Sequence, residues 1–278
     1  MRYKTLFFLL TFVWTALSVT GKQRDFVLQS GIPVPIACNS SEEQVVHTAL
    51  ELLRRDLQTV LSATAKVETN TGTILIGTAG RSELIDQSGV DTSVLKGKKQ
   101  AFLLTVSPEG KLIVAGSDGH GTAYGILEIS RLLGVSPWEW WADVTPEKKK
   151  LFKLSSKFRS VQSPSVEYRG IFINDEDWGL MPWSNKTYEP SDVNGEIGPR
   201  TNERIFELLL RLRANTYWPA MHECTLPFFL TKGNREVAKK YGIFMGASHC
   251  EPMACSAAGE WRRRGNGAYD YVNNSAEI

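Results

Sequence analysis

Three stretches in the second half of the chain share one design, a short run of apolar and small residues that ends in Asn, Asp, His or Glu. They are Tyr168–Glu176, Asn215–Glu223 and Tyr241–Glu251. A helical pattern separates the first two. In a (β/α) barrel, helices alternate with parallel strands and the active site lies at the carboxyl ends of the strands. The pattern therefore predicts barrel strands with polar tips, and carboxylates at those tips indicate acid/base hydrolysis.

Size and charge narrow the class of protein. A chain of 278 residues suggests about two domains. The formal net charge is only +2 and no basic stripe stands out, so we expect no nucleic-acid partner. The basic run Lys148–Lys150 lies in a polar connector and is typical of a solvated linker.

The first 21 residues have the pattern of a secretory signal peptide. Basic Arg2 and Lys4 precede the apolar run Leu6–Val13, and small residues follow up to Gly21. This run is shorter than the ~20 residues that a spanning helix needs. We expect an exported protein, periplasmic or secreted, with no membrane contact once the signal is removed.

Residues 22–160 predict an α/β domain. Its expected elements are strands at 26–28, 35–38 and 73–77, a hairpin of strands 102–106 and 111–115, and helices at 40–61 and 122–133. Ser40 and Glu43 have the spacing of a capping box at the start of the first helix. Cys38 is expected to remain a free thiol in a strand, because four cysteines in so long a chain are no disulfide scaffold.

Residues 161–278 predict the first part of a barrel. Helices are expected at 200–213 and 236–240, between the three strand stretches. A complete (β/α)8 barrel needs about 250 residues, roughly twice what this region holds. No closing element precedes Ile278, so we expect the front part of a longer protein.

Two motifs have competing interpretations. Gly116–Gly125 follows a strand and opens a helix, but its glycine spacing is one residue too long for a dinucleotide fingerprint, which favours a tight turn. Trp138, Trp140 and Trp141 form either a hydrophobic clasp between the domains or the rim of a sugar site.

A metal site is a third alternative. His222 and His249 follow neighbouring predicted strands, as in barrel metallohydrolases. The His-x-His typical of the first strand of those enzymes is absent, which favours sugar hydroxyls over a metal as the ligand of these side chains.

The acidic run Asp175–Asp177 follows an apolar strand and precedes Trp178. Such a run is often a solvated loop, but this place favours a functional role. Glu176 and Asp177 are expected to matter less than Asp175 if they only continue into a solvated loop. Arg169 lies within the strand and needs an anion inside the barrel. A protein carboxylate and an acidic substrate both remain open as that anion.

Several motifs together resemble the signatures of glycoside hydrolase family 115. The barrel motifs are Tyr168–Gly179, Asn215–Glu223 and Ser248–Met253, and the first domain adds Gly121–Gly125 and Ser136–Asp143. They occur in the right order over nearly all of the chain after the leader. Each motif alone is weak, and the set is specific.

The resemblance implies an inverting α-glucuronidase that removes 4-O-methylglucuronic or glucuronic acid from xylan or xylo-oligosaccharides. It implies a domain like the second domain of hexosaminidases, followed by a catalytic (β/α)8 barrel, of which this chain holds about three strands. It also implies that the general acid lies beyond Ile278, that no cofactor or metal is needed, and that a homodimer is one option for the full-length form.

The resemblance assigns the glucuronate pocket to the strand tips. Asp175 and Glu223 are the candidates that support catalysis. The full set of expected substrate-binding residues is Arg169, Asn174, Asp175, Trp178, His222, Glu223, His249 and Glu251. The alternatives are a non-catalytic truncated product and a metal-dependent barrel hydrolase.

Overall fold

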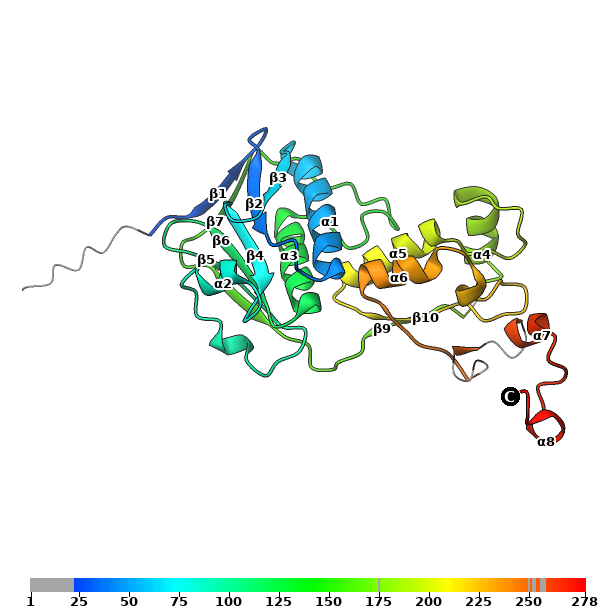
Figure 1. The fold of residues 1–278 in the computed structure, drawn as a ribbon. Coiled ribbons are helices and arrows are strands. Elements are labelled where there is room, and N and C mark those ends of the chain that lie inside the picture. Colours follow the sequence, from blue (N-terminus) through cyan, green and yellow to red (C-terminus); the bar gives the residue numbers. More distant parts are fainter. Residues whose placement is uncertain (1–22, 175, 250, 252–253, 256–258) are drawn as a thin grey trace, which may run out of the picture.

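The computed structural model describes residues 23–278 except 175, 250, 252–253 and 256–258. It is a mixed α/β structure of two modules (Figure 1). The first is an open sheet covered by helices, and the second is a smaller layer of helices over short strands. The predicted signal segment lies outside the described residues. Among the helices that are described, none has the length and apolar character needed to cross a membrane.

A six-stranded sheet forms the centre of the first module, in the order β3-β2-β4-β6-β5-β8. Strands β2, β3, β4 and β6 run parallel, and β5 is antiparallel to both β6 and β8. The strands are β2 (Val34–Cys38), β3 (Ala65–Glu68), β4 (Ile74–Thr78), β5 (Phe102–Val106), β6 (Leu112–Gly116) and β8 (Arg159–Gln162). A separate antiparallel pair joins β1 (Phe26–Gln29) to β7 (Leu151–Leu154).

Helices cover both faces of this sheet because its central strands are apolar on both sides. Along β4, Ile74 and Ile76 pack with the long helices α1 (Gln44–Leu61) and α3 (Gly119–Leu133). Leu75 points to the other face, where short α2 (Glu83–Asp86) and η1 (Ser93–Leu95) lie. Strands buried on both faces are expected to be continuously apolar, as these are.

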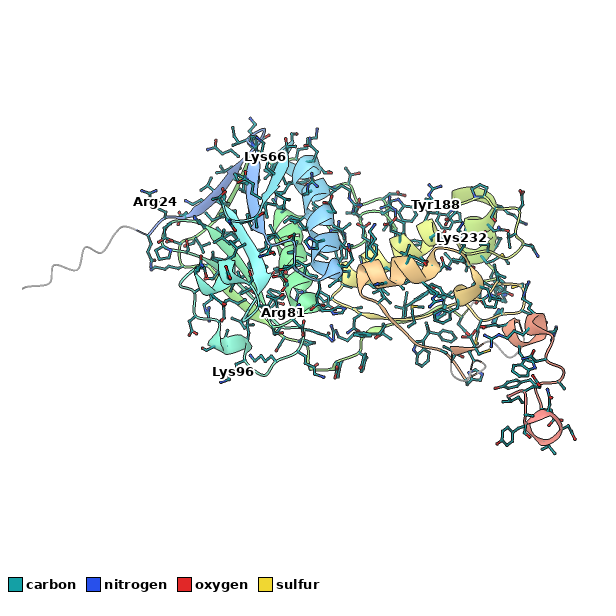
Figure 2. The ribbon with its side chains drawn as sticks, in the orientation of Figure 1. Arg24, Lys66, Arg81, Lys96, Tyr188 and Lys232 are labelled. Atoms are coloured by element: carbon teal, nitrogen blue, oxygen red, sulfur yellow. The ribbon has the colours of Figure 1, made fainter. Side chains whose placement is uncertain are left out.

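The start of α1 corrects one prediction. The helix begins at Gln44, and Glu43 at its N-cap makes no side-chain capping bond, so the predicted capping box is wrong. Glu43 instead pairs with Arg81 at 2.7 Å, a residue labelled in Figure 2. Asn39 organises the preceding turn by accepting hydrogen bonds from Ser41. Tertiary pairing thus replaces the local cap that the spacing suggested.

The second module is a parallel three-stranded sheet in the order β11-β10-β9. Helix α5 (Pro199–Arg211) connects β9 to β10, and α6 (Asn234–Tyr241) connects β10 to β11. The remaining elements are β9 (Gly170–Phe172), β10 (Thr216–Trp218), β11 (Phe244–Met245), α4 (Leu180–Trp183), a π-type turn η2 (Ser184–Tyr188), η3 (Phe228–Leu230), α7 (Glu260–Arg264) and α8 (Tyr271–Asn274).

Only one face of the small sheet is covered. Tyr217 is buried against Phe206 and Phe228 on the helical side. Trp218 and Phe244 are each more than a third exposed. The strand–helix–strand order is what the sequence predicted, and three parallel strands by themselves form an open sheet.

Buried ion pairs join the two modules. Arg211 of α5 contacts Asp56 of α1 through two hydrogen bonds of 2.9 and 3.0 Å, and both side chains are 4% exposed. Glu207 of α5 accepts from Arg211 and from Arg55 of α1. Charges removed from water in this way need each other, because an unpaired buried charge is costly.

The strand pairing predicts where the first module ends. A protein comprising residues 23–162 should unfold cooperatively, because it keeps β7 and β8 paired with β1 and β5. One ending at residue 150 should lose both pairings and much of its stability. Urea unfolding followed by circular dichroism makes the comparison. Equal midpoints for the two proteins would show that β7 and β8 contribute nothing to the module.

The junction makes a second prediction. Asp56→Ala should destabilise the chain by about 3 kcal/mol, because Arg211 stays buried with one carboxylate fewer. Glu51→Ala is the matched control on the same helix, since its pair with Arg54 is exposed and is worth at most about 1 kcal/mol. Chemical denaturation of both variants measures the difference. A cost for Asp56→Ala no larger than the control would mean that the buried pair does not hold the modules together.

Candidate active site at the strand tips

The carboxyl ends of β9, β10 and β11 lie at one edge of the small sheet because the three strands are parallel neighbours. The residues that follow each strand therefore come together. Glu176 and Asp177 follow β9, His222 follows β10 and Glu251 follows β11. This is the arrangement expected from the polar tips in the sequence.

Glu176 is the most buried acid of this group, with 0% exposure. Its Oε1 accepts a hydrogen bond of 2.6 Å from the backbone N–H of His222 and one of 3.4 Å from the hydroxyl of Thr225. Its Oε2 has no hydrogen-bond partner. The expectation that Glu176 continues into a solvated loop is therefore wrong: the side chain turns inward and ties the β9 tip to the β10 loop.

The ring of His222 lies between two carboxylates. Its Nδ1 is 3.0 Å from Oδ1 of Asp177 and 3.9 Å from Oε2 of Glu176. With Nδ1 carrying the proton, the ring donates to Asp177, and this bond fixes both the tautomer and the ring orientation. Asp177 therefore also belongs to the site, contrary to the expectation of a solvated loop.

Glu251 has the electrostatics of an acid/base group. Its side chain is buried beside the turn that begins at Ser248. Burial, and then the nearby charges of Glu176 and Glu260, raise the pKa of Glu251 to about 7. A carboxyl group with that pKa exchanges a proton near neutral pH, which is what a general acid, a general base or a donor to an anionic ligand requires.

The other expected tip residues lie further out. Asn174 and His249 are exposed, and Trp178 is 86% exposed. The side chain of Glu223 is 61% exposed and pairs with Arg262 at 3.0 Å. Asp175 lies outside the described residues. The structure thus brings together His222 and Glu251 from the expected set, and adds Glu176 and Asp177.

Arg169 is a correction. It precedes β9, at the end of the strand opposite the tips, and its guanidinium binds neutral oxygens instead of an anion. Its Nε donates to the carbonyl of Arg213, and a terminal nitrogen donates to the side chain of Gln100 at 2.7 Å. The remaining acceptors are the carbonyls of Val166 and Glu167 and the hydroxyl of Tyr124. These five bonds use every N–H direction of the group, which leaves none for a substrate.

The metal alternative has a different geometry from the one expected. Possible ligand atoms of Glu176, Asp177 and His222 lie within 4.8 Å of one another. His249 is exposed and stands outside this group, so the expected pair of imidazoles does not form one site. Ordinary hydrogen bonds account for two contacts of the cluster, those that His222 makes with Asp177 and with Glu176.

The glycine-rich turn before α3 is filled by carboxylates. Asp118 caps the helix by accepting from the N–H of Gly121, and Glu42 accepts from the N–H of Thr78. Glu43 lies against Gly119. A phosphate would need these donors and would meet negative charge. This geometry supports the tight-turn interpretation over a dinucleotide site.

Two of the three tryptophans, Trp140 and Trp141, form a clasp, while Trp138 is about half exposed. Trp141 donates to the carbonyl of Arg204 on α5 at 3.1 Å. Trp140 packs against Trp183 and Tyr188 of the second module and lies 5.0 Å from the guanidinium of Arg204. The rings thus join the modules, as the clasp interpretation predicted.

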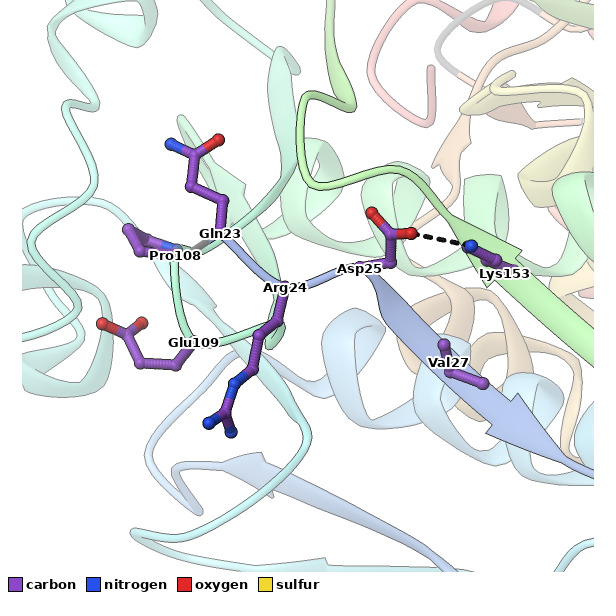
Figure 3. A pocket seen from close by; sticks show the side chains of 7 residues that line it. All are labelled: Gln23, Arg24, Asp25, Val27, Pro108, Glu109 and Lys153. Carbon is purple, nitrogen blue, oxygen red and sulfur yellow. Dashed lines mark ion pairs between the residues drawn. The ribbon is translucent and has the colours of Figure 1, made fainter. Parts of the chain in front are cut away.

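A hollow beside β1 carries no comparable chemistry. Figure 3 shows its lining, in which the carboxylate of Asp25 pairs with Lys153 at 2.8 Å. This pair lowers the pKa of Asp25, so the carboxylate stays ionised. The hollow lies on the first module, away from β9 and β10 (Figure 1).

Comparisons with known proteins show what this chain is similar to. A sequence model of glycosyl hydrolase family 115 matches residues 161–278. A solved structure with 82% identity and a TM-score of 0.90 is described as a family GH115 4-O-methyl-α-glucuronidase, BtGH115A, with specificity for decorated arabinogalactans. The match covers 91% of this chain and 33% of that one, so this chain spans a third of its relative. No curated protein sequence matches.

More distant structures share the fold alone. A Streptomyces plicatus β-hexosaminidase has a TM-score of 0.51 at 11% identity, covering 81% of this chain and 42% of its own. The structure of CpGH84D has a TM-score of 0.52 at 10% identity, covering 81% and 35%. The likeness to a hexosaminidase agrees with the fold that the sequence predicted for the first module.

The raised pKa of Glu251 predicts that the stability of the folded chain depends on pH. In the folded protein the pKa of Glu251 is about 7, above its ordinary value of 4.5. Protonation of Glu251 therefore stabilises the folded chain at low pH, and this contribution is lost as the pH rises from 4.5 to 7. Glu251→Gln, which cannot ionise, should therefore gain in melting temperature relative to the unchanged chain between pH 5 and pH 8. Glu51→Gln, at an exposed position of α1, is the control. A pH-independent difference for Glu251→Gln would contradict the raised pKa.

Proposed function

Because the chain belongs to glycosyl hydrolase family 115, we propose that it supplies the first module and first strand tips of an exported, inverting α-glucuronidase. The observation that carries this proposal is the 82% identity, over 91% of the chain, to a 4-O-methyl-α-glucuronidase. The leader-like first 21 residues support export to the periplasm or the medium. A (β/α)8 barrel begun by β9, β10 and β11, and a homodimeric full-length form, belong to the same proposal.

The proposed substrate is a polysaccharide that carries 4-O-methylglucuronic acid. The similar enzyme is described as specific for decorated arabinogalactans, which favours such a backbone for this protein. Glucuronoxylan and its oligosaccharides, which the family signatures suggest, are the second candidate backbone. Either backbone presents the same anionic sugar to the strand tips.

The tip residues suit an anionic sugar. Carboxylates such as those of Glu176 and Asp177 repel a glucuronate, and the ring of His222 lies between these two side chains. Because Nδ1–H of His222 donates to Asp177, the ring donates to the sugar only through Nε2–H of its doubly protonated form. Glu251 is partly protonated near neutral pH because its pKa is about 7, so it can also donate to the sugar carboxylate. Inversion needs a second carboxyl about 6.5–9.5 Å from the first, with room for a water molecule. We place the general acid of that pair beyond Ile278.

The activity prediction compares two lengths of the protein. The full-length protein should release 4-O-methylglucuronic acid from decorated arabinogalactan faster than from glucuronoxylan. The 278-residue chain alone should release none, because it lacks one carboxyl of the pair. Chromatography of the released sugar acid measures both. Release by the short chain would contradict the division of the catalytic pair, and inactivity of the full-length protein on both polysaccharides would favour a non-catalytic product.

A chelator tests the remaining alternative, a metal-dependent hydrolase. Activity of the full-length protein should survive dialysis against EDTA, because the proposed reaction uses carboxyl groups and a water molecule. Loss of activity that zinc or manganese restores would instead support the metal-dependent hydrolase.

A further inference from the structure

Glu176 is unusual among the acids at the strand tips because it is wholly buried and yet only half satisfied. Burial of an ionised carboxylate is costly unless hydrogen bonds compensate for the lost water. Oε1 has two donors, the backbone N–H of His222 and the hydroxyl of Thr225. Among the residues that the structure describes, Oε2 has none. A side chain held at such a cost is a candidate for a role in function.

The contacts of Glu176 join the tips of β9 and β10. It follows β9, and it fixes the main chain of His222 after β10 through a short bond of 2.6 Å. Its second oxygen lies 3.9 Å from Nδ1 of the same residue, on which Asp177 also acts at 3.0 Å. The backbone and the ring of His222 are therefore both set by acids from the neighbouring tip.

Glu176 also acts on the third tip. Its negative charge is the largest neighbouring-charge contribution that raises the pKa of Glu251, after burial itself. Among the described residues, Glu260, which pairs with Arg264, and the thiol of Cys255 also lie near Glu251. Of the two acids that act on Glu251, Glu176 is the one that also contacts His222.

We propose that Glu176 is a positioning residue of this site, which fixes the backbone and the ring of His222 where the sugar carboxylate is received. It acts through His222 and not on the substrate, and its charge beside Glu251 provides a second readout. The proposal rests on the proposed glucuronidase function and adds to it a residue that the sequence assigned to a solvated loop.

Two variants of the full-length protein distinguish the effect of the Glu176 charge from the effect of its side-chain length. Glu176→Gln keeps an oxygen for the N–H of His222 but removes the charge. It should lower kcat/KM at least about tenfold, and shift the Glu251 limb of its pH profile to lower pH. Glu176→Asp keeps the charge but shortens the side chain, so it should lower kcat/KM and leave the limb nearer its original pH. Glu51→Gln is the control and should change neither.

Several outcomes would overturn the proposal. Near-normal kcat/KM in both variants, or an unshifted limb in Glu176→Gln, would show that Glu176 does not position this site. Loss of folding in both variants would assign it to the core alone. An NMR titration of the Glu251 carboxyl in the unchanged protein and in Glu176→Gln reads the coupling without substrate. If the unchanged protein has no glucuronidase activity, the proposed function fails, while the titration still decides whether Glu176 controls Glu251.

Discussion

The buried pairing of Asp56 with Arg211 is the constraint on which the rest of the structure depends. It ties α5 to α1 through buried side chains, and Glu207 and Arg55 extend the same link. Because α5 leads directly into β10, its position decides where that strand lies beside β9. The first module thereby acts as a platform for the strand tips. Charge pairs suit this task, since a buried carboxylate and guanidinium tolerate few alternative geometries.

The same parallel sheet that gathers the tips also creates their electrostatic problem. Several acids meet at one edge, and the expected ligand is itself an anion. The structure meets this with a histidine ring between Glu176 and Asp177 and with a raised pKa for Glu251. The ring bridges the two acids, and the protonated form of Glu251 supplies a hydrogen-bond donor. Acids this close together shift the pKa of Glu251, and shifted pKa values are common at functional sites.

Periodicity predicted α1, α3, α5 and α6, because their apolar faces are set by local sequence. It missed the short strands β3, β7 and β8. Features that depend on distant residues were not predictable. Glu43 lost its predicted capping role to Arg81, which lies 38 residues later in the chain. Arg169 found carbonyl groups and Gln100 instead of an anion. Within the acidic run, the residue buried beside His222 is Glu176, a choice that the sequence run alone does not reveal.

The central claim is that these strand tips receive the carboxylate of a glucuronic acid residue. A crystal structure of the full-length protein with bound 4-O-methylglucuronic acid tests it most directly. We expect the sugar carboxylate within hydrogen-bond distance of His222 or Glu251, with Glu176 behind them and out of contact with the sugar. A sugar bound elsewhere, with the tips of β9, β10 and β11 covered by protein, would contradict the account.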